Sequence, residues 1–299
     1  MPKFSLEAGS SLRGIACMLV SGIFLTTNDS ITKWLVPHYP TGEILFIQGT
    51  LIAILVASWM LLRGENPLRV VRWRSHLSRG VMYVIGSFAF VYSLRYLPLA
   101  EVIAIAFAGP LFMTLFGKIF LNEHVGIHRL GAVVIGFIGI LIVIRPGTSA
   151  MQWAALLPLI VALSDAFRDL ITRTLTRDES SLRIIFTTAV ILALGGGVTV
   201  VAGWDPVRSV DVIWFCCSAV SFVVAHYFMV EAFRHAQVVV VAPFRYFLIV
   251  WAIISGYVFW GEIPDDAVYI GVAVVIAAGI YIGWREARVG HASKPGIGH

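Results

Sequence analysis

Long apolar stretches of about 20 residues follow one another along nearly the whole chain, and short segments rich in Pro, Gly and Asn separate them. An apolar helix of about 20 residues crosses the ~30 Å hydrocarbon core of a bilayer. The alternating pattern of a transmembrane barrel does not appear. The pattern therefore predicts an all-α integral membrane protein with ten transmembrane helices. The predicted spans are 11–34, 42–62, 77–95, 99–120, 128–145, 151–172, 182–203, 211–233, 239–260 and 266–285.

Composition supports this class of protein. The 299 residues are 59% hydrophobic and 13% charged, with a mean hydropathy of +0.87, whereas soluble domains carry about 25% charged residues. Most of the 22 Lys and Arg residues fall in the segments on the side of the N-terminus, which predicts that both termini are cytoplasmic. This topology accounts for the net charge of +5 without a nucleic-acid partner, and for the arginines between residues 63 and 79 without a specific lipid contact.

The chain contains an internal repeat, because residues 94–123 and 233–262 align at a constant offset. The two halves, 1–146 and 147–299, are each predicted to hold five spans, so the second copy enters the membrane from the opposite side. Such an inverted repeat is typical of transporters, whose substrate path lies where the halves meet. Paired positions include Arg95 and Arg234, Gly117 and Gly256, and Glu123 and Glu262.

The repeated motifs resemble those of the drug/metabolite transporter superfamily, EamA type. In the first half these are Ser93-Leu94-Arg95-Tyr96, Pro110 and Asn122-Glu123; in the second they are Ala232-Phe233-Arg234-His235 and Gly261-Glu262-Ile263-Pro264. Asn122 stands where the family usually has Gly, and Pro243 replaces a later Pro, changes that touch packing more than function. The closing glutamates are expected to make hydrogen bonds at helix ends.

The resemblance implies a fold and a function. It implies a central cavity lined mainly by spans 1, 3, 4, 6, 8 and 9, and export of small metabolites across the inner membrane. Length and aromatic-rich spans further resemble the YddG-type exporters of aromatic and other neutral amino acids. We therefore expect a monomeric carrier with amino-acid substrates and membrane lipid as its surroundings. Scarce deep carboxylates leave proton antiport and facilitated diffusion both open.

Polar residues inside the spans are the candidates for substrate contact, because charges in a bilayer are costly. Asp165, Arg168 and Asp169 share one helix face, so a self-neutralising structural group and a substrate site are both possible. Arg245 is the deepest cation and follows Pro243; it is placed to meet a substrate carboxylate or Asp165, or to snorkel toward the inner surface. Near the outer end of span 1, Asn28 offers an amide, and Asp29 is spaced for an ion pair with Lys33.

Further candidates carry rings. His226 titrates near neutrality in its unperturbed state, although a hydrogen-bonded His between helices explains it equally well, and Tyr227 is its neighbour in span 8. Tyr83, Phe107 and Tyr246 lie on spans expected to line the cavity, and aromatic faces suit a bulky ring. Phe107 and Tyr246 occupy equivalent positions of the repeat.

Two other functions compete with export of amino acids. Carriers of cationic drugs or nucleotide sugars in the same fold are the first alternative, but span 1 has no central Glu and only Arg245 is a deep cation. An intramembrane lipid-modifying enzyme is the second, although the residues 165–169 lack the spacing of a metal site. The sequence has no HExxH, P-loop or dinucleotide motif and no CxxC among its three Cys, so neither catalysis nor a metal or cofactor is expected.

Overall fold

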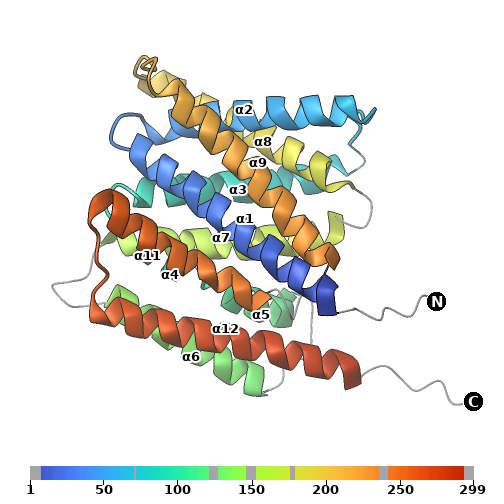
Figure 1. Ribbon diagram of the computed structural model, residues 1–299, viewed down its shortest axis with the longest axis vertical. Coiled ribbons are helices and arrows are strands. Elements are labelled where there is room, and N and C mark those ends of the chain that lie inside the picture. Colours follow the sequence, from blue (N-terminus) through green and yellow to red (C-terminus); the bar gives the residue numbers. More distant parts are fainter. Residues whose placement is uncertain are drawn as a thin grey trace, which may run out of the picture.

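The computed structural model describes residues 8–70, 72–120, 127–145, 153–175, 179–235 and 242–292. Within these ranges all regular structure is helical, as predicted (Figure 1). The first half contains α1 (Ala8–Leu35), α2 (Thr41–Leu62), α3 (Trp73–Ser93), α4 (Leu99–Ala106), α5 (Gly109–Phe120) and α6 (Ile127–Ile144). The second contains η1 (Trp153–Ala155), α7 (Leu156–Leu175), α8 (Ser181–Gly197), η2 (Val198–Ala202), α9 (Val212–His235), η3 (Ala242–Tyr246), α11 (Phe247–Trp260) and α12 (Asp266–Ala292).

Several described helices are suited to cross a membrane. By length and composition, the clear candidates are Leu12–Leu35, Thr41–Leu62, Ser181–Ala202 and Val212–Ala232. Four other described helices are apolar but shorter than these: Leu99–Met113, Leu130–Ile144, Phe244–Trp260 and Asp266–Tyr281. The boundary between the predicted halves, at residues 146 and 147, lies outside the described residues.

Two predicted spans are not continuous α-helices. The span predicted at 99–120 is interrupted between Ala106 and Gly109, because Pro110 has no N–H to donate to the carbonyl of Ala106. The span predicted at 239–260 contains a 3-10 segment, η3, that includes Pro243, and becomes α-helical at Phe247. Both interruptions fall in the repeated part of the sequence.

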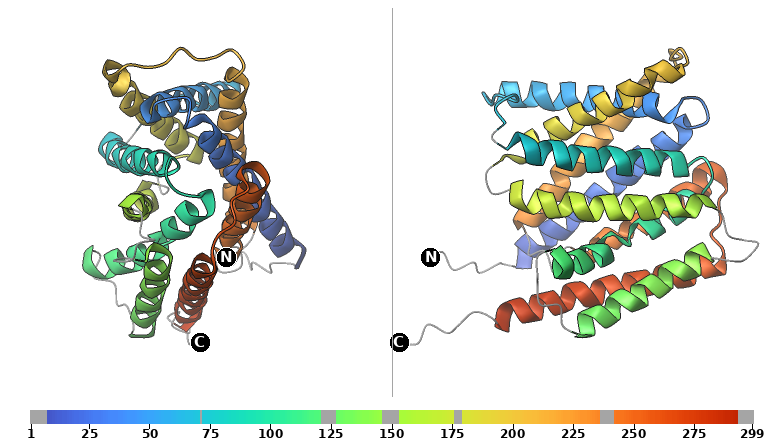
Figure 2. Two further views of the ribbon diagram at one scale, coloured as in Figure 1. Left: turned by 90° about the vertical axis from the view of Figure 1, so that its left-hand side faces the viewer. Right: turned by 180° about the vertical axis from the view of Figure 1, so that it is seen from behind.

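The main helix contacts join elements from before and after residue 146. α1 packs on α9, α2 on α8, α3 on α7, α6 on α12, and α4 on α11. Figures 1 and 2 show these pairs side by side, with α6 and α12 forming one end of the bundle. At the α6–α12 contact a β-carbon on Gly139 would lie 2.9 Å from the carbonyl oxygen of Gly271, so the two backbones approach as closely as small residues permit.

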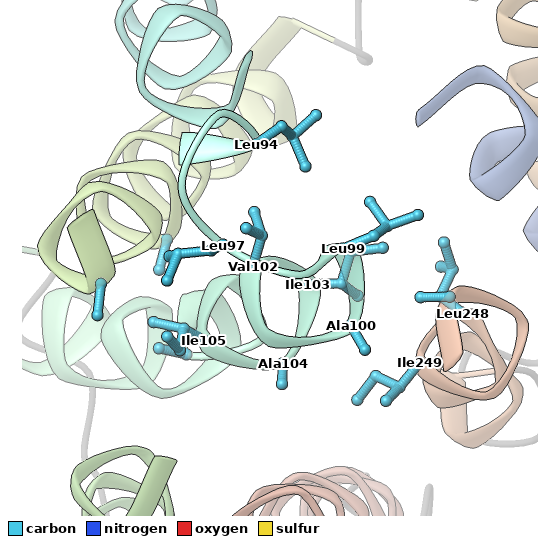
Figure 3. Close-up of a cluster of buried hydrophobic side chains, with 14 of the residues drawn as sticks. Leu94, Leu97, Leu99, Ala100, Val102, Ile103, Ala104, Ile105, Leu248 and Ile249 are labelled. Atoms are coloured by element: carbon cyan, nitrogen blue, oxygen red, sulfur yellow. The ribbon is translucent and has the colours of Figure 1, made fainter. Parts of the chain in front are cut away.

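The core is centred on the short helix α4. Leu99, Val102 and Ala104 are almost completely buried, and Figure 3 shows Leu248 and Ile249 of α11 facing α4 from the other half. Lipid tails are as apolar as leucine, so this contact stabilises the bundle mainly by close packing rather than by removal from water. The core thereby fixes the position at which the broken helix α4–α5 lies within the bundle.

A polar link closes the connection before α12. The Asp265 carboxylate accepts a hydrogen bond from the Val268 amide at 3.1 Å and forms an ion pair with Arg145 at the end of α6. The hydrogen bond satisfies one of the free amides at the start of α12, the role expected of an acidic helix start. The Arg145 guanidinium is the main reason that the pKa of Asp265 is lowered.

We expect Asp265→Asn to remove a stability contribution that depends on pH. Since the pKa of Asp265 is lowered in the folded protein, the contribution is present above the unfolded pKa of about 3.9 and is lost as pH falls through the folded pKa. Thermal unfolding of the purified protein between pH 7 and pH 3 measures it. The gap in melting temperature between wild type and Asp265→Asn should close in acid; a gap of constant size would contradict this.

Candidate functional site

The interrupted helices bring two predicted ring residues together. Phe107 follows the last residue of α4, and Tyr246 is the last residue of η3 and the N-cap of α11. Their ring centroids lie 5.0 Å apart with an interplanar angle of 33°. The two residues are equivalent in the sequence repeat, so the contact joins matching points of the two halves. Both rings are half-buried and retain accessible surface.

A charged group lies on α7. Arg168 Nη1 is 2.6 Å from Asp165 Oδ1, and its Nη2 is 2.9 Å from Asp169 Oδ1. The predicted self-neutralising group is therefore present. The Asp165 side chain nevertheless remains 35% exposed, which leaves oxygen atoms available for another partner. A carboxylate that is paired and still accessible is suited to contact a polar solute in an apolar surrounding.

The charged group and the ring pair are neighbours. A β-carbon on Gly109, two residues after Phe107, would lie 4.0 Å from Cβ of Asp165, and one on Gly86 of α3 would lie 4.0 Å from its Oδ1. Asp165 therefore lies beside the start of α5, where the helix dipole favours a negative charge. Helix interruptions next to charged side chains are where transporters with repeats bind their substrates.

Other predicted residues surround this point. Arg168 lies over the Tyr83 ring, with its guanidinium carbon 5.8 Å from the centroid. Arg79 of α3 donates to Thr172 Oγ1 of α7 at 2.8 Å, one turn after Arg168, and Arg245 directly precedes Tyr246 in η3. Residues from α3, α7 and η3 thus lie together near the ring pair.

Asn28 belongs to a hydrogen-bond network that sequence reasoning missed. Ser218 Oγ donates to Asn28 Oδ1 at 2.7 Å, and the buried Gln48 amide donates to Ser218 Oγ and to Thr32 Oγ1. Because its oxygen is occupied, the Asn28 amide directs its nitrogen to Asp29 at 3.2 Å. Gln48 is the single amide within the predicted span 42–62, and a polar group at that depth was a signal that could have revealed it.

Lys33 has a partner other than Asp29, with which the sequence spacing permits a local ion pair. Lys33 forms an ion pair with Glu262 and lies 4.9 Å from the centroid of the Trp260 ring. The other Glu262 oxygen accepts from the Leu99 amide at 3.4 Å. The Lys33 side chain is directed to α11, so Lys33 pairs with Glu262 of the other half of the chain and not with Asp29 in its own helix. Glu262 therefore has the predicted helix-end role, at the start of α4; Glu123 lies outside the described residues.

The two remaining ring candidates are placed differently. His226 Nδ1 is 2.9 Å from the Phe222 carbonyl oxygen one turn earlier in α9, and its ring stacks on that of Phe222. Its bond is thus within one helix and does not join two helices. Tyr227 is 40% exposed and packs against Trp59 of α2. The structure does not bring Tyr227 to the ring pair.

The described residues contain no group of three or more His, Cys, Asp or Glu able to hold a metal ion. What these residues do offer is an aromatic contact, an accessible carboxylate and surrounding arginines at an interrupted helix. Together with the apolar helices, these features are the ones expected of a multi-pass membrane transporter of small molecules.

Comparison with known proteins shows which family this chain resembles. Residues 12–145 match a sequence model of the EamA-like transporter family. A riboflavin transporter of Rhizobium johnstonii is 28% identical over 95% of this chain and 95% of its own length. An S-adenosylmethionine uptake transporter of Rickettsia prowazekii is 26% identical over 93% of this chain and 94% of its own. The first part of the chain thus resembles the EamA-like transporter family, and these two relatives, both named as transporters, are similar to it along nearly its whole length.

Two further likenesses bear on substrate and fold. A pseudopaline exporter of Pseudomonas aeruginosa is 25% identical over 89% of this chain and 95% of its own length. A solved crystal structure superposes with a TM-score of 0.64 over 95% of this chain and 99% of that one, at 17% identity, and shows the fold. The protein is thus a bacterial-type inner-membrane metabolite transporter. The names of these relatives do not support the narrower prediction, export of aromatic amino acids.

Proposed function

We propose that this protein is a carrier that moves a small metabolite with a planar ring and a charged polar group across the inner membrane by alternating access. The observation that carries the proposal is the Phe107–Tyr246 ring pair beside the accessible carboxylate of Asp165. The rings offer aromatic faces to a planar group, and Asp165 and Arg245 offer partners for opposite charges. Riboflavin and S-adenosylmethionine, named for two relatives, both contain planar heteroaromatic rings.

Alternating access in this proposal rests on an inverted repeat of five spans per half, 1–146 and 147–299, with cytoplasmic termini. Helix packing supports it. If α1, α2, α3 and α6 correspond to α7, α8, α9 and α12, the contact of α1 with α9 becomes that of α7 with α3, and the contacts of α2 with α8 and α6 with α12 become themselves. A two-fold arrangement requires this exchange, and it lets either half open the central site.

Aromatic amino acids, the substrates expected from the sequence, are the smallest members of the proposed class. The names of the relatives include both uptake and export, so neither direction is built into the family. We propose a facilitator whose direction follows the gradient, since the accessible carboxylate is already paired with Arg168.

Uptake into proteoliposomes tests this function. We expect labelled riboflavin, S-adenosylmethionine or tryptophan to exchange, with transport unchanged by a pH gradient. Phe107→Ala and Tyr246→Ala should each lower the apparent affinity for a ring substrate by about two- to tenfold, because an aromatic pair contributes about 0.5–1.5 kcal/mol beyond burial. Tyr227→Ala, at a ring remote from the site, is the matched control. Equal transport of a ring-free solute such as alanine, with no effect of the two substitutions, would overturn the proposal.

A further inference from the structure

Two apolar grooves of about 650 Å³ each run along the outer surface of the described bundle. One lies between α2 and α8 and the other between α3 and α7. Their side chains are turned outward: Leu194 and Val198 of the first are 66% and 73% exposed, and Leu77 and Val81 of the second are 47% and 41% exposed. In a membrane such grooves face acyl chains.

The grooves differ in charge. The α2–α8 groove is lined by apolar residues and one threonine: Phe46, Thr50, Ala53, Ile54, Val190, Ala193, Leu194, Gly197 and Val198. The α3–α7 groove has Trp73 and Arg74 at the start of α3, followed by Leu77, Ser78, Val81, Met82, Phe167 and Ile171. The two grooves have the same volume, but only the α3–α7 groove is lined by a charged residue. The α2–α8 groove therefore serves as an internal control for the effect of charge.

The charged groove has the shape of a lipid site. From Trp73 to Met82 the helix rises about 14 Å at 1.5 Å per residue, a length over which an extended acyl chain makes continuous contact. Trp73 is 60% exposed, and tryptophan is favoured at the level of lipid headgroups. The guanidinium of Arg74 lies 5.4 Å from the centroid of that ring, at the same end of the groove.

Charge complementarity selects the headgroup. Arg74 is exposed at the end of the groove, and no acidic side chain lines the groove among the described residues. Basic residues near the membrane surface attract anionic lipids, and guanidinium groups match the geometry of phosphate. In the sequence, membrane topology alone explains the arginines between residues 63 and 79. The structure adds a groove next to Arg74 in which a lipid acyl chain fits.

We propose that the α3–α7 groove binds an anionic phospholipid, with one acyl chain along Leu77, Val81 and Ile171 and its phosphate against Arg74. Phe167 and Ile171 flank the turn of α7 that carries Arg168 and Asp169. The lipid therefore contacts the helix whose other side chains form the charged group of the site. Binding itself does not depend on the proposed transport function.

Native mass spectrometry of the purified full-length protein with added phosphatidylglycerol or phosphatidylcholine tests the site. We expect phosphatidylglycerol to be retained in preference, and Arg74→Ala to weaken that retention about fivefold. Arg63→Ala is the matched control, because Arg63 is also exposed and stacked on a tryptophan, Trp59, but lines neither groove. Val81→Trp, which fills the groove without a change of charge, should lower retention of the same lipid.

Three outcomes would overturn the proposal. Equal retention of both lipids would mean that the groove selects a chain and not a headgroup. An equal loss in Arg74→Ala and Arg63→Ala would assign the effect to overall positive charge. Competition by glycerol phosphate as effective as that by phosphatidylglycerol would show an anion site without a chain. Arg74→Lys, which keeps the charge, should retain most binding and separates loss of contact from misfolding.

Discussion

Glu262→Ala is expected to destabilise the protein by about 3–5 kcal/mol, because it leaves the buried Lys33 without its partner. The Lys33 side chain is 7% exposed and that of Glu262 is 24% exposed. The substitution also removes the carboxylate that accepts from the Leu99 amide at the start of α4. One side chain thus links α1, α4 and the end of α11, which belong to both halves of the chain.

Thermal unfolding in detergent, followed with single and double variants, measures this effect. Glu262→Gln should cost less than Glu262→Ala, since the amide oxygen still accepts from Leu99. Lys33→Met combined with Glu262→Gln should recover much of the loss, because replacing both members of a buried ion pair is often close to neutral. If the losses of the two single variants simply add, Lys33 and Glu262 do not act as a pair.

The ring pair illustrates what the sequence could predict. Phe107 and Tyr246 were aligned by the internal repeat, and the structure places their rings 5.0 Å apart. The repeat and the apolar pattern also predicted the helical class and most helix ends. The chemistry of Pro110 explains the interruption after Ala106, although the pattern of apolar residues alone predicted a continuous span.

Contacts between residues far apart in the sequence could not be predicted from the spacing of residues within one helix. Lys33 is four residues from Asp29 but pairs with Glu262 of the other half, and no periodicity reports a partner so far away. Tyr227 illustrates a second limit. Its helix, α9, is apolar on most sides, so the sequence does not tell which face is directed to the interior. Gln48 was overlooked even though a lone amide in an apolar span is informative.

Gly279→Ala is expected to displace Tyr246 and weaken binding of ring substrates, although Gly279 lies on α12, outside the helices expected to line the cavity. A β-carbon at this position would overlap the Tyr246 hydroxyl and lie 2.5 Å from its Cζ. Tyr246 is the N-cap of α11, so the side chain must move more than the backbone. Overpacking of this kind costs about 1–3 kcal/mol, which at the middle of that range corresponds to a loss of affinity of about thirtyfold if all of it falls on binding.

A double-mutant cycle distinguishes this effect from general damage to α12. If Gly279 acts through Tyr246, Gly279→Ala should raise the KM for a ring substrate in the wild-type background but add nothing in the Tyr246→Ala background. Gly131→Ala on α6 is the matched control, since among the described residues no atom lies within 4 Å of the position that its new methyl group would take. If the effects of Gly279→Ala and Tyr246→Ala on the KM are additive, Gly279 does not act through Tyr246. Non-additivity would establish that the missing side chain at Gly279 sets the place of the aromatic ring, and with it the size of planar group that the site accepts.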